Sequence, residues 1–334
     1  FKGPDRPKDV RHPEAFHAFR NGKPKAENLL LETCRDPESP AFTRAGAMLA
    51  LRQFISKASY DEARRNLDAN DSVVRVAAIT KLEDLPDDEL HRELVPMLED
   101  PIRTVRTEAA RILARVPQTL FSPEDPKTFT QVFEELKLRY TSNLDRPESH
   151  LSLGILAENR NQPADAEKHY RKAVHRESTY VPARMNLATL LSRHGRSKEA
   201  EEILREAAEL QPSWGQVHYS LGLLLAEDRN RLPEAIRSLE RASAYWRDNP
   251  RVFNNLAIAY WQSDKIDNAI RAFLQAIKLE PDNPEFVQNM VQLLVQRGRW
   301  ADALPHARSM ARLLPENPQA QAFLAQIERN ALAQ

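Results

Sequence analysis

The chain has 334 residues, of which 41% are hydrophobic and 29% are charged, so it is long enough to form two domains. Its 48 Lys and Arg residues balance 48 Asp and Glu residues, so the chain has no net charge that would attract a polyanion. We therefore do not expect nucleic acid as a partner. Only 8 glycines accompany 23 prolines, which favours an all-α fold in which prolines separate the helices.

Residues 1–23 are the least regular part of the chain, and we interpret them as an N-terminal extension. The chain begins at Phe1 without a methionine, so we expect it to be a processed piece of a longer protein. The first residues lack the apolar core of a signal peptide, and no apolar run in the sequence approaches the ~20 residues of a membrane span. We therefore expect no membrane insertion.

A 31-residue period is visible in residues 24–117, where it relates Arg44, Arg75 and Arg106. The same period relates alanines and leucines of core type: Ala47, Ala78, Ala109, Leu51, Leu82 and Leu113. The segments open with Ser39-Pro40, Asp71 and Asp100-Pro101, which are residues that cap and start helices. This pattern resembles short HEAT-type repeats, and the resemblance implies stacked helical hairpins.

The only cysteine, Cys34, lies in the helix-like stretch NLLLETC of this region. We expect it to be a buried, small apolar residue and not a reactive thiol.

Residues 118–146 contain one strongly amphipathic segment. It places five apolar side chains on one helical face: Phe129, Val132, Phe133, Leu136 and Tyr140. A flexible linker would be more polar and would lack this spacing. We therefore predict a connector helix that joins two solenoids through an apolar seam.

A second repeat occupies residues 147–318, with a period of 34 or 35 residues. Small or apolar residues recur in the first helix of each unit: Gly154, Ala188, Gly222, Ala257 and Val291. Others recur in the second helix: Ala166, Ala200, Ala235, Ala269 and Ala303, then Ala173, Ala207, Ala242, Ala276 and Met310. Pro212, Pro281 and Pro315 follow the second helix and stop it.

This second pattern resembles the tetratricopeptide repeat, with five units legible. The resemblance implies a superhelix of helical hairpins, so the predicted fold is an all-α solenoid of HEAT-like repeats followed by tetratricopeptide repeats. We expect residues 319–334 to form a final capping helix that covers the last apolar face.

The sequence contains no motif typical of nucleotide binding, zinc hydrolysis, serine hydrolysis or dithiol chemistry. Its nine histidines are scattered without helical i, i+4 pairing, which favours ordinary surface or packing roles. We therefore expect no enzymatic activity, no metal site and no cofactor within this chain.

The tetratricopeptide resemblance implies that the first helix of each unit lines a concave groove. Two residues before each small position stand Ser152, Asn186, Ser220, Asn255 and Asn289. A side-chain amide offers a donor and an acceptor, which match the backbone of an extended peptide. The row is similar to the asparagine ladder of some peptide-binding superhelices. The alternative is that Asn and Ser are merely tolerated at a half-exposed position.

Further residues are expected to face the groove: Tyr219, Arg251, Asn254, Trp261, Gln262, Gln288 and Gln292. Tyr, Trp and Arg dominate binding hot spots, although Tyr219 and Trp261 could instead pack between repeats. Only Arg193 and Arg251 fall near the groove, which is too few cations for a clamp on an acidic C-terminus.

The runs GPDRP and HPEAFHAFRNG near the N-terminus resemble the stretch after the last haem segment in bacterial multihaem c-type cytochromes that continue into HEAT-like and tetratricopeptide repeats. The resemblance implies haem c upstream of Phe1 and a periplasmic or extracellular location. Cys34 is followed by Arg and Asp and cannot form a haem-attachment motif. His12 or His17 is a candidate axial ligand of an upstream haem, and the alternative for both is a structural role.

We expect a non-enzymatic scaffold whose groove binds a peptide or a partner subunit. The competing function is electron transfer, with this chain as the docking arm of a multihaem cytochrome and other cytochrome subunits as partners. A third possibility is self-assembly, against which the predicted capping helix argues.

Overall fold

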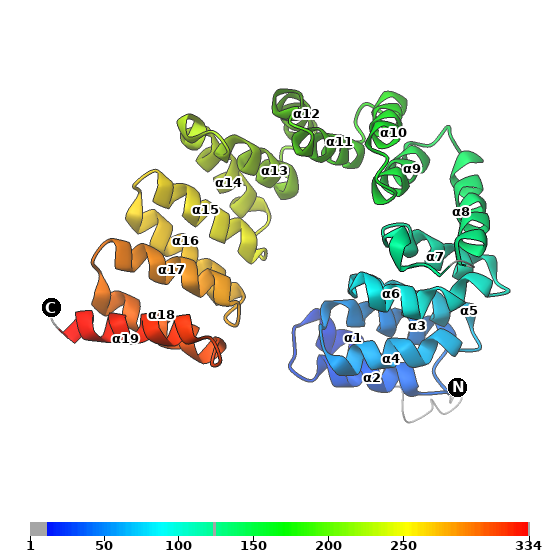
Figure 1. Cartoon of the computed structure of the whole chain (residues 1–334), viewed down its shortest axis with the longest axis horizontal. Coiled ribbons are helices and arrows are strands. Elements are labelled where there is room, and N and C mark those ends of the chain that lie inside the picture. The colour runs from blue at the N-terminus through cyan, green and yellow to red at the C-terminus, as the bar shows by residue number, and fades with distance from the viewer. Residues whose placement is uncertain (1–11, 123–124, 333–334) are drawn as a thin grey trace, which may run out of the picture. The chain divides into compact units, whose positions relative to one another are not determined.

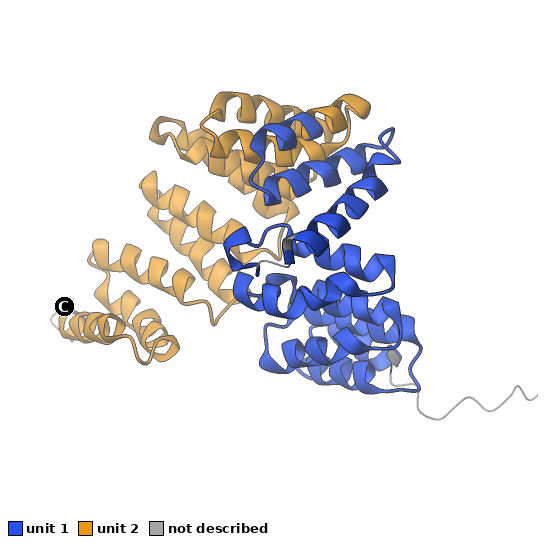
Figure 2. Cartoon of the chain, turned by 45° about the vertical axis from the view of Figure 1, so that its right-hand side comes forward, with its two compact units in different colours: residues 1–169 blue, residues 170–334 orange. Residues whose placement is uncertain are grey.

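The computed structural model describes residues 12–122 and 125–332, and over those residues it contains nineteen α-helices and no strand. The predicted all-α fold is confirmed. The chain forms two compact units, residues 1–169 (unit 1) and 170–334 (unit 2), which are described separately below (Figure 2). The GPDRP run lies outside the described residues.

Unit 1 is a series of short helices (Figure 1). Their bounds are α1 (His12–Arg20), α2 (Ala26–Arg35), α3 (Ala41–Ala50), α4 (Lys57–Arg65), α5 (Ser72–Lys81), α6 (Asp87–Leu94), α7 (Arg103–Leu113), α8 (Asp125–Thr141), α9 (Pro147–Asn159) and the first part of α10 (Pro163–Arg176). A stack runs through this unit, in which α3 packs on α5, α5 on α7 and α7 on α8. The alanines and leucines of the 31-residue period lie in this stack and are fully buried.

Arginines of the same period link neighbouring elements of unit 1. Arg44 donates to Asp71 at 2.7 Å, and Arg75 donates to both oxygens of Asp100 at 2.7 and 3.0 Å. Arg106 likewise makes a bidentate interaction with both oxygens of Glu135 on α8, at 2.8 and 2.7 Å. Helix α8 therefore joins the stack through the same chemistry that joins the repeats before it.

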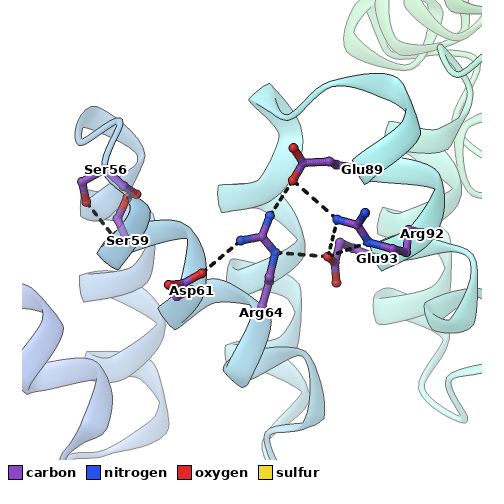
Figure 3. Close-up of polar contacts among 7 residues, drawn as sticks. All are labelled: Ser56, Ser59, Asp61, Arg64, Glu89, Arg92 and Glu93. Carbon is purple, nitrogen blue, oxygen red and sulfur yellow. Dashed lines mark hydrogen bonds and ion pairs between the residues drawn. The ribbon is translucent and has the colours of Figure 1, made fainter.

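The helices α4 and α6 are also joined by charge. Arg64 of α4 donates to Asp61 of its own helix and reaches Glu89 and Glu93 of α6 at 2.6 and 3.1 Å (Figure 3). Figure 3 also shows Arg92 beside the same two glutamates. One guanidinium thus bridges two helices through several carboxylates.

Two predictions for unit 1 concern burial. Cys34 is buried at 3% exposure, and burial raises the pKa of its thiol to about 12, so at neutral pH it is an unreactive thiol.

In α8 the side chains of Phe129, Val132 and Leu136 are buried, as the predicted apolar face requires. This face packs against α7 and α9, so α8 is an ordered part of unit 1.

Unit 2 consists of helical hairpins. They follow the end of α10 and comprise α11 (Val181–Arg193) with α12 (Ser197–Leu210), α13 (Gly215–Ala226) with α14 (Leu232–Tyr245), α15 (Pro250–Gln262) with α16 (Ile266–Leu279), and α17 (Pro284–Gln296) with α18 (Trp300–Leu313). A last helix, α19 (Pro318–Leu332), packs on α18 and buries Ile327 against it. The first helices α11, α13, α15 and α17 also contact one another in order.

The recurring small residues lie where the two helices of a hairpin cross. Gly222 shows why they are small, because a Cβ there would lie 2.7 Å from Leu239 Cγ and 3.2 Å from the Leu239 nitrogen. Ala235 and Ala242 on the facing helix are fully buried. Close approach of the two backbones therefore needs little or no side chain on either helix.

The turn inside four of the hairpins uses one left-handed residue: Asn161, Gly195, Asp264 and Gly298, with φ of 55°, 76°, 60° and 68°. At each turn the following residue donates its N–H to a carbonyl one turn back in the first helix, as Arg196 does to Leu191 at 2.9 Å. This is the Schellman arrangement that ends a helix. The step from Gly222 to Ala257 is 35 residues, one more than the other steps, and a short 3-10 turn, Arg229–Arg231, lies between α13 and α14.

Asparagine followed by proline starts three later helices, α15, α17 and α19. The side chains of Asn249, Asn283 and Asn317 accept hydrogen bonds from backbone N–H groups two residues on, each at 3.0 Å. Each cap satisfies a helix donor that would otherwise lack a partner.

Candidate functional site

The predicted groove residues of unit 2 lie on the four first helices α11, α13, α15 and α17. We call the surface that they form the A-helix face and define it by the predicted site residues Asn186, Tyr219, Ser220, Arg251, Asn254, Asn255, Trp261, Gln262, Gln288 and Asn289. The side chains of Asn186, Ser220, Asn255 and Asn289 are all half-buried, which fits both the predicted contact surface and the alternative that Asn and Ser are tolerated at a half-exposed position.

The side chain of Asn255 is held in place by the preceding hairpin. Its Nδ2 donates a hydrogen bond of 2.6 Å to the hydroxyl of Tyr219 on α13. Tyr219 lies edge-on to Trp246, with ring centroids 6.0 Å apart and an interplanar angle of 86°. Burial raises the pKa of Tyr219, so the phenol is neutral at physiological pH and can accept this bond. The amide oxygen and the second N–H of Asn255 stay available to a ligand.

Asn289 is held in the same way. Its Nδ2 donates to Oδ1 of Asn254 on α15 at 3.0 Å. Asn254 itself is only 2% exposed, so its side chain can act on a ligand only by positioning Asn289. The structure therefore places Asn254, predicted to face the groove, beneath the surface.

Trp261 makes a third bond between first helices. Its indole Nε1 donates to Oε1 of Gln296 on α17 at 2.9 Å. Gln296 and Trp246 were not among the predicted site residues. Because each is the immediate partner of a predicted aromatic residue, they can be found only when the packing of neighbouring helices is known.

The three bonds share one register. Positions are counted from the small residue of each unit (Gly222, Ala257 or Val291). In every bond, the residue in the later unit stands one position further toward the C-terminus than its partner does in the earlier unit. Neighbouring first helices are therefore displaced by one residue along the A-helix face. The bonds form a row of three separate pairs between successive helices: a phenol with an amide, two amides, and an indole with an amide.

Five of the ten predicted residues take no part in these bonds. The side chains of Asn186 and Ser220 form no hydrogen bond with another residue in the part of the chain that the structure describes, so their polar atoms are open to solvent or to a ligand. Arg251 and Gln262 on α15 and Gln288 on α17 are exposed.

Charge is scarce on these helices. The four first helices of unit 2 contain only four ionised side chains: Arg184, Arg193, Arg251 and Glu285. Arg184 is buried at 9% exposure and pairs with Glu206 of α12, which leaves three exposed charges. The A-helix face is thus polar and almost neutral, so it suits a ligand bound by hydrogen bonds more than one bound by charge.

The candidate haem ligands lie far from this row in the sequence, on α1 in unit 1. Helix α1 begins at His12, whose side chain is outside the described part, and His17 is exposed. The amide of Asn21 donates to the backbone carbonyl of His17 at 2.7 Å. Over the described residues no group of three or more His, Cys, Asp or Glu side chains is placed to hold a metal ion. None of the helices described is both long and apolar enough to cross a bilayer.

The protein-family models that match this chain fit the hairpin pattern of unit 2. Family models of the tetratricopeptide repeat match residues 159–224, 261–327 and 219–284. No curated protein matches the chain. Similar solved structures include MamA, which is 18% identical with a TM-score of 0.47 and for which the match covers 51% of this chain and 92% of that one.

Two further structures are similar to this chain. YrrB, described as a TPR protein with an unusual peptide-binding site, is 17% identical with a TM-score of 0.47, over 55% of this chain and 94% of that one. PilF of Pseudomonas aeruginosa is 23% identical with a TM-score of 0.47, over 56% of this chain and 87% of that one.

Proposed function

Because residues 159–327 consist of tetratricopeptide repeats, we propose that this chain is a non-enzymatic scaffold that binds an extended segment of a partner protein on the A-helix face. The row of amides held by bonds between neighbouring first helices carries this proposal. Asn255 and Asn289 each use one N–H to bind the neighbouring helix and keep the rest of the amide for a ligand.

The fixed amides lower the cost of binding. A free asparagine side chain loses rotamer freedom when a ligand orders it, whereas Asn255 and Asn289 are already ordered by Tyr219 and Asn254. Amides that face an extended chain can donate to its carbonyls and accept from its N–H groups. Such a face recognises the main chain of the ligand more than its side chains.

The small number of charges gives the proposal a second consequence. Exposed ion pairs weaken as salt screens them, whereas hydrogen bonds to neutral groups do not. Binding on the A-helix face should therefore change by less than about threefold between low and physiological salt.

The proposal is tested with the full chain and short random peptides selected for binding to it by display. The triple variant Asn186→Ala, Asn255→Ala, Asn289→Ala should bind the selected peptides at least about tenfold more weakly, since each neutral hydrogen bond contributes about 0.5–1.5 kcal/mol. The matched control is Thr189→Ala on α11, whose exposed hydroxyl donates to the backbone of its own helix. Equal affinity of the triple variant, with its helical content intact, would show that the face does not bind peptide.

We also propose that residues 24–117 are short HEAT-like repeats. The support is the recurrence of Arg44, Arg75 and Arg106 with equivalent ion pairs to the next element. In this proposal unit 1 presents a rigid helical surface and unit 2 provides the peptide-binding face.

The cytochrome alternative gains no support from the described residues. It rests on sequence runs that lie mostly at the N-terminus and on haem segments upstream, and His17 has no feature of a ligand beyond its exposure. We therefore do not extend the proposal to electron transfer, a periplasmic location or haem.

A further inference from the structure

A hollow of about 430 Å³ lies within unit 1, where α8 ends and α9 begins (Figure 1). We call it the α8–α9 hollow. Its lining comes from the last turn of α8, the connecting loop and the first two turns of α9. Six of its seven lining side chains can donate a hydrogen bond, and the seventh is the carboxylate of Glu148. The hollow is therefore lined mainly by donors.

The charged groups of the lining are two guanidinium groups and one carboxylate. Arg139 lies in the last turn of α8 and Arg146 directly precedes α9, and both are exposed. Neither guanidinium forms an ion pair or a hydrogen bond with another described residue, although that of Arg139 lies 5.9 Å from the centre of the Tyr140 ring. Asp145 on the same loop is exposed and does not line the hollow. The lining thus has a net positive charge.

The N-terminus of α9 adds to this positive charge. Arg146 occupies the N-cap position and its side chain makes no capping bond, whereas Asn249, Asn283 and Asn317 cap α15, α17 and α19. The first N–H groups of a helix have no partner within it, and the helix dipole is equivalent to about half a positive charge at this end. The uncapped first turn of α9 therefore favours an anion.

A buried hydroxyl in the same turn is an independent indication of a ligand. Ser149 is only 8% exposed and lines the hollow. Its hydroxyl forms no hydrogen bond with any residue that the structure describes. A buried polar group without a partner costs stability, so such groups are nearly always satisfied. A group bound in the hollow would supply the partner that Ser149 lacks.

We propose that the α8–α9 hollow binds a phosphate group, either free or as a phosphomonoester. A phosphomonoester has about 1.5 to 2 negative charges at neutral pH and three strong acceptor oxygens. These match the two guanidinium groups, the hydroxyl of Ser149 and the first N–H groups of α9. A carboxylate has one charge and two oxygens, so it would leave more of the donors unused. The residues of the A-helix face take no part, so this proposal and the proposed function can fail separately.

The test compares the full chain in inorganic phosphate and in chloride at equal ionic strength and near neutral pH. Phosphate should raise the melting temperature more than chloride does, and calorimetry should show saturable binding of phosphate. Arg139→Gln combined with Arg146→Gln should weaken this binding at least about tenfold, because the variant loses two charge-assisted donors. The matched control is Arg237→Gln combined with Arg241→Gln, at two exposed arginines of α14, and it should bind phosphate normally.

Single variants test the geometry of the hollow. Ser149→Ala should weaken phosphate binding about threefold to tenfold, because one hydrogen bond is lost. Glu148→Gln removes the only carboxylate of the lining and should strengthen binding about threefold. Asp145→Asn removes an equal charge outside the lining and should have a smaller effect than Glu148→Gln.

Competition distinguishes the two sources of phosphate. A phosphoserine peptide that displaces inorganic phosphate at a lower concentration than phosphate itself would identify a phosphorylated partner segment, and equal potency would identify the free anion. The proposal is overturned if phosphate acts like chloride, if the folded Arg139, Arg146 variant binds like the parent, if the control pair weakens binding equally, or if Ser149→Ala and Glu148→Gln both leave the affinity unchanged. The Asn186, Asn255, Asn289 triple variant should bind phosphate normally.

Discussion

In unit 1, neighbouring elements are joined by guanidinium and carboxylate groups, whereas in unit 2 the first helices are joined by neutral amides, a phenol and an indole. Arg75 and Arg106 each donate from Nε and Nη2 to the two oxygens of one partner carboxylate. Asn255 and Asn289 each use a single N–H. Ionic links leave little bonding capacity for a ligand, while amide links leave most of it.

This comparison also separates stability from binding. A paired arginine and carboxylate that are both largely buried become costly when one is removed, because the other remains charged and unpaired. Removal of Asn255 should cost little stability, because water can reach its half-buried partner Tyr219, whereas removal of Asn289 leaves Oδ1 of the buried Asn254 without a donor. We therefore expect substitutions in the arginine series to affect folding most, and substitutions in the amide row to affect ligand binding most.

The largest effect is expected at Arg75. Its side chain is 11% exposed, Asp100 is 6% exposed, and Arg75 also binds the carbonyls of Ala69 and Asn70. Arg75→Ala should lower the free energy of unfolding by about 3 kcal/mol, because Asp100 is left buried without its partner. Arg205→Ala, at an arginine 46% exposed, should cost at most about 0.5 kcal/mol. Urea unfolding followed by circular dichroism measures both, and equal costs would contradict the account.

A smaller effect is expected at the helix crossing in unit 2. Gly222→Ala places a Cβ against Leu239 and should lower the free energy of unfolding by about 2 kcal/mol. Gly195→Ala tests backbone strain alone, because a Cβ there meets nothing within 4 Å while φ is 76°, and it should cost about 1 kcal/mol. Thermal and urea unfolding of the two variants can be compared directly. A neutral Gly222→Ala would mean that the hairpin tolerates a wider crossing.

Lys81 is the exception to the ionic pattern of unit 1, and replacing it should increase stability. Its side chain is 1% exposed, its Nζ donates to the Phe54 carbonyl at 3.0 Å and lies 3.8 Å from the centre of the Tyr60 ring. No described carboxylate lies within ion-pair distance of it, and burial lowers its pKa from 10.5. Lys81→Met should raise the free energy of unfolding by about 1 kcal/mol at neutral pH.

The gain from Lys81→Met should depend on pH in a defined direction. Because the folded-state pKa of Lys81 is below the unfolded value, the buried charge costs stability at all pH values below the folded pKa. As pH rises through the folded pKa, the folded protein loses this proton before the unfolded chain does, and the cost disappears. Urea unfolding at neutral and alkaline pH should therefore show a shrinking advantage, and a constant or growing one would contradict the assignment.

The sequence predicted the features that depend on one helix or one hairpin. The small residues at Gly222, Ala235 and Ala242, and the burial of Cys34, follow from spacing and composition. The left-handed turn position was harder to predict, because Gly195 and Gly298 mark it clearly whereas Asn161 and Asp264 do so only weakly. The 31-residue period also aligns Lys81 with Ala50 and Ile112, a signal of burial that its charge conceals.

Features between hairpins could not be predicted from spacing alone. The three arginines of the period were visible, but their partners Asp71, Asp100 and Glu135 follow at 27, 25 and 29 residues and so show no common offset. The one-residue displacement that joins the amides depends on how one hairpin rotates on the next. For the same reason, the sequence did not show that Asn254 lies beneath the surface or that Gln296 binds Trp261.

The measurement that tests the central claim most directly is photo-crosslinking of the full chain with a selected peptide that carries a benzophenone side chain at its centre. We predict that mass spectrometry will locate the crosslinks on α13, α15 and α17, near Ser220, Asn255 and Asn289, and that the Asn186, Asn255, Asn289 triple variant will lose them. Crosslinks confined to unit 1 or to α12 and α14, or crosslinks that the triple variant retains in full, would contradict the assignment of the A-helix face as the peptide-binding surface.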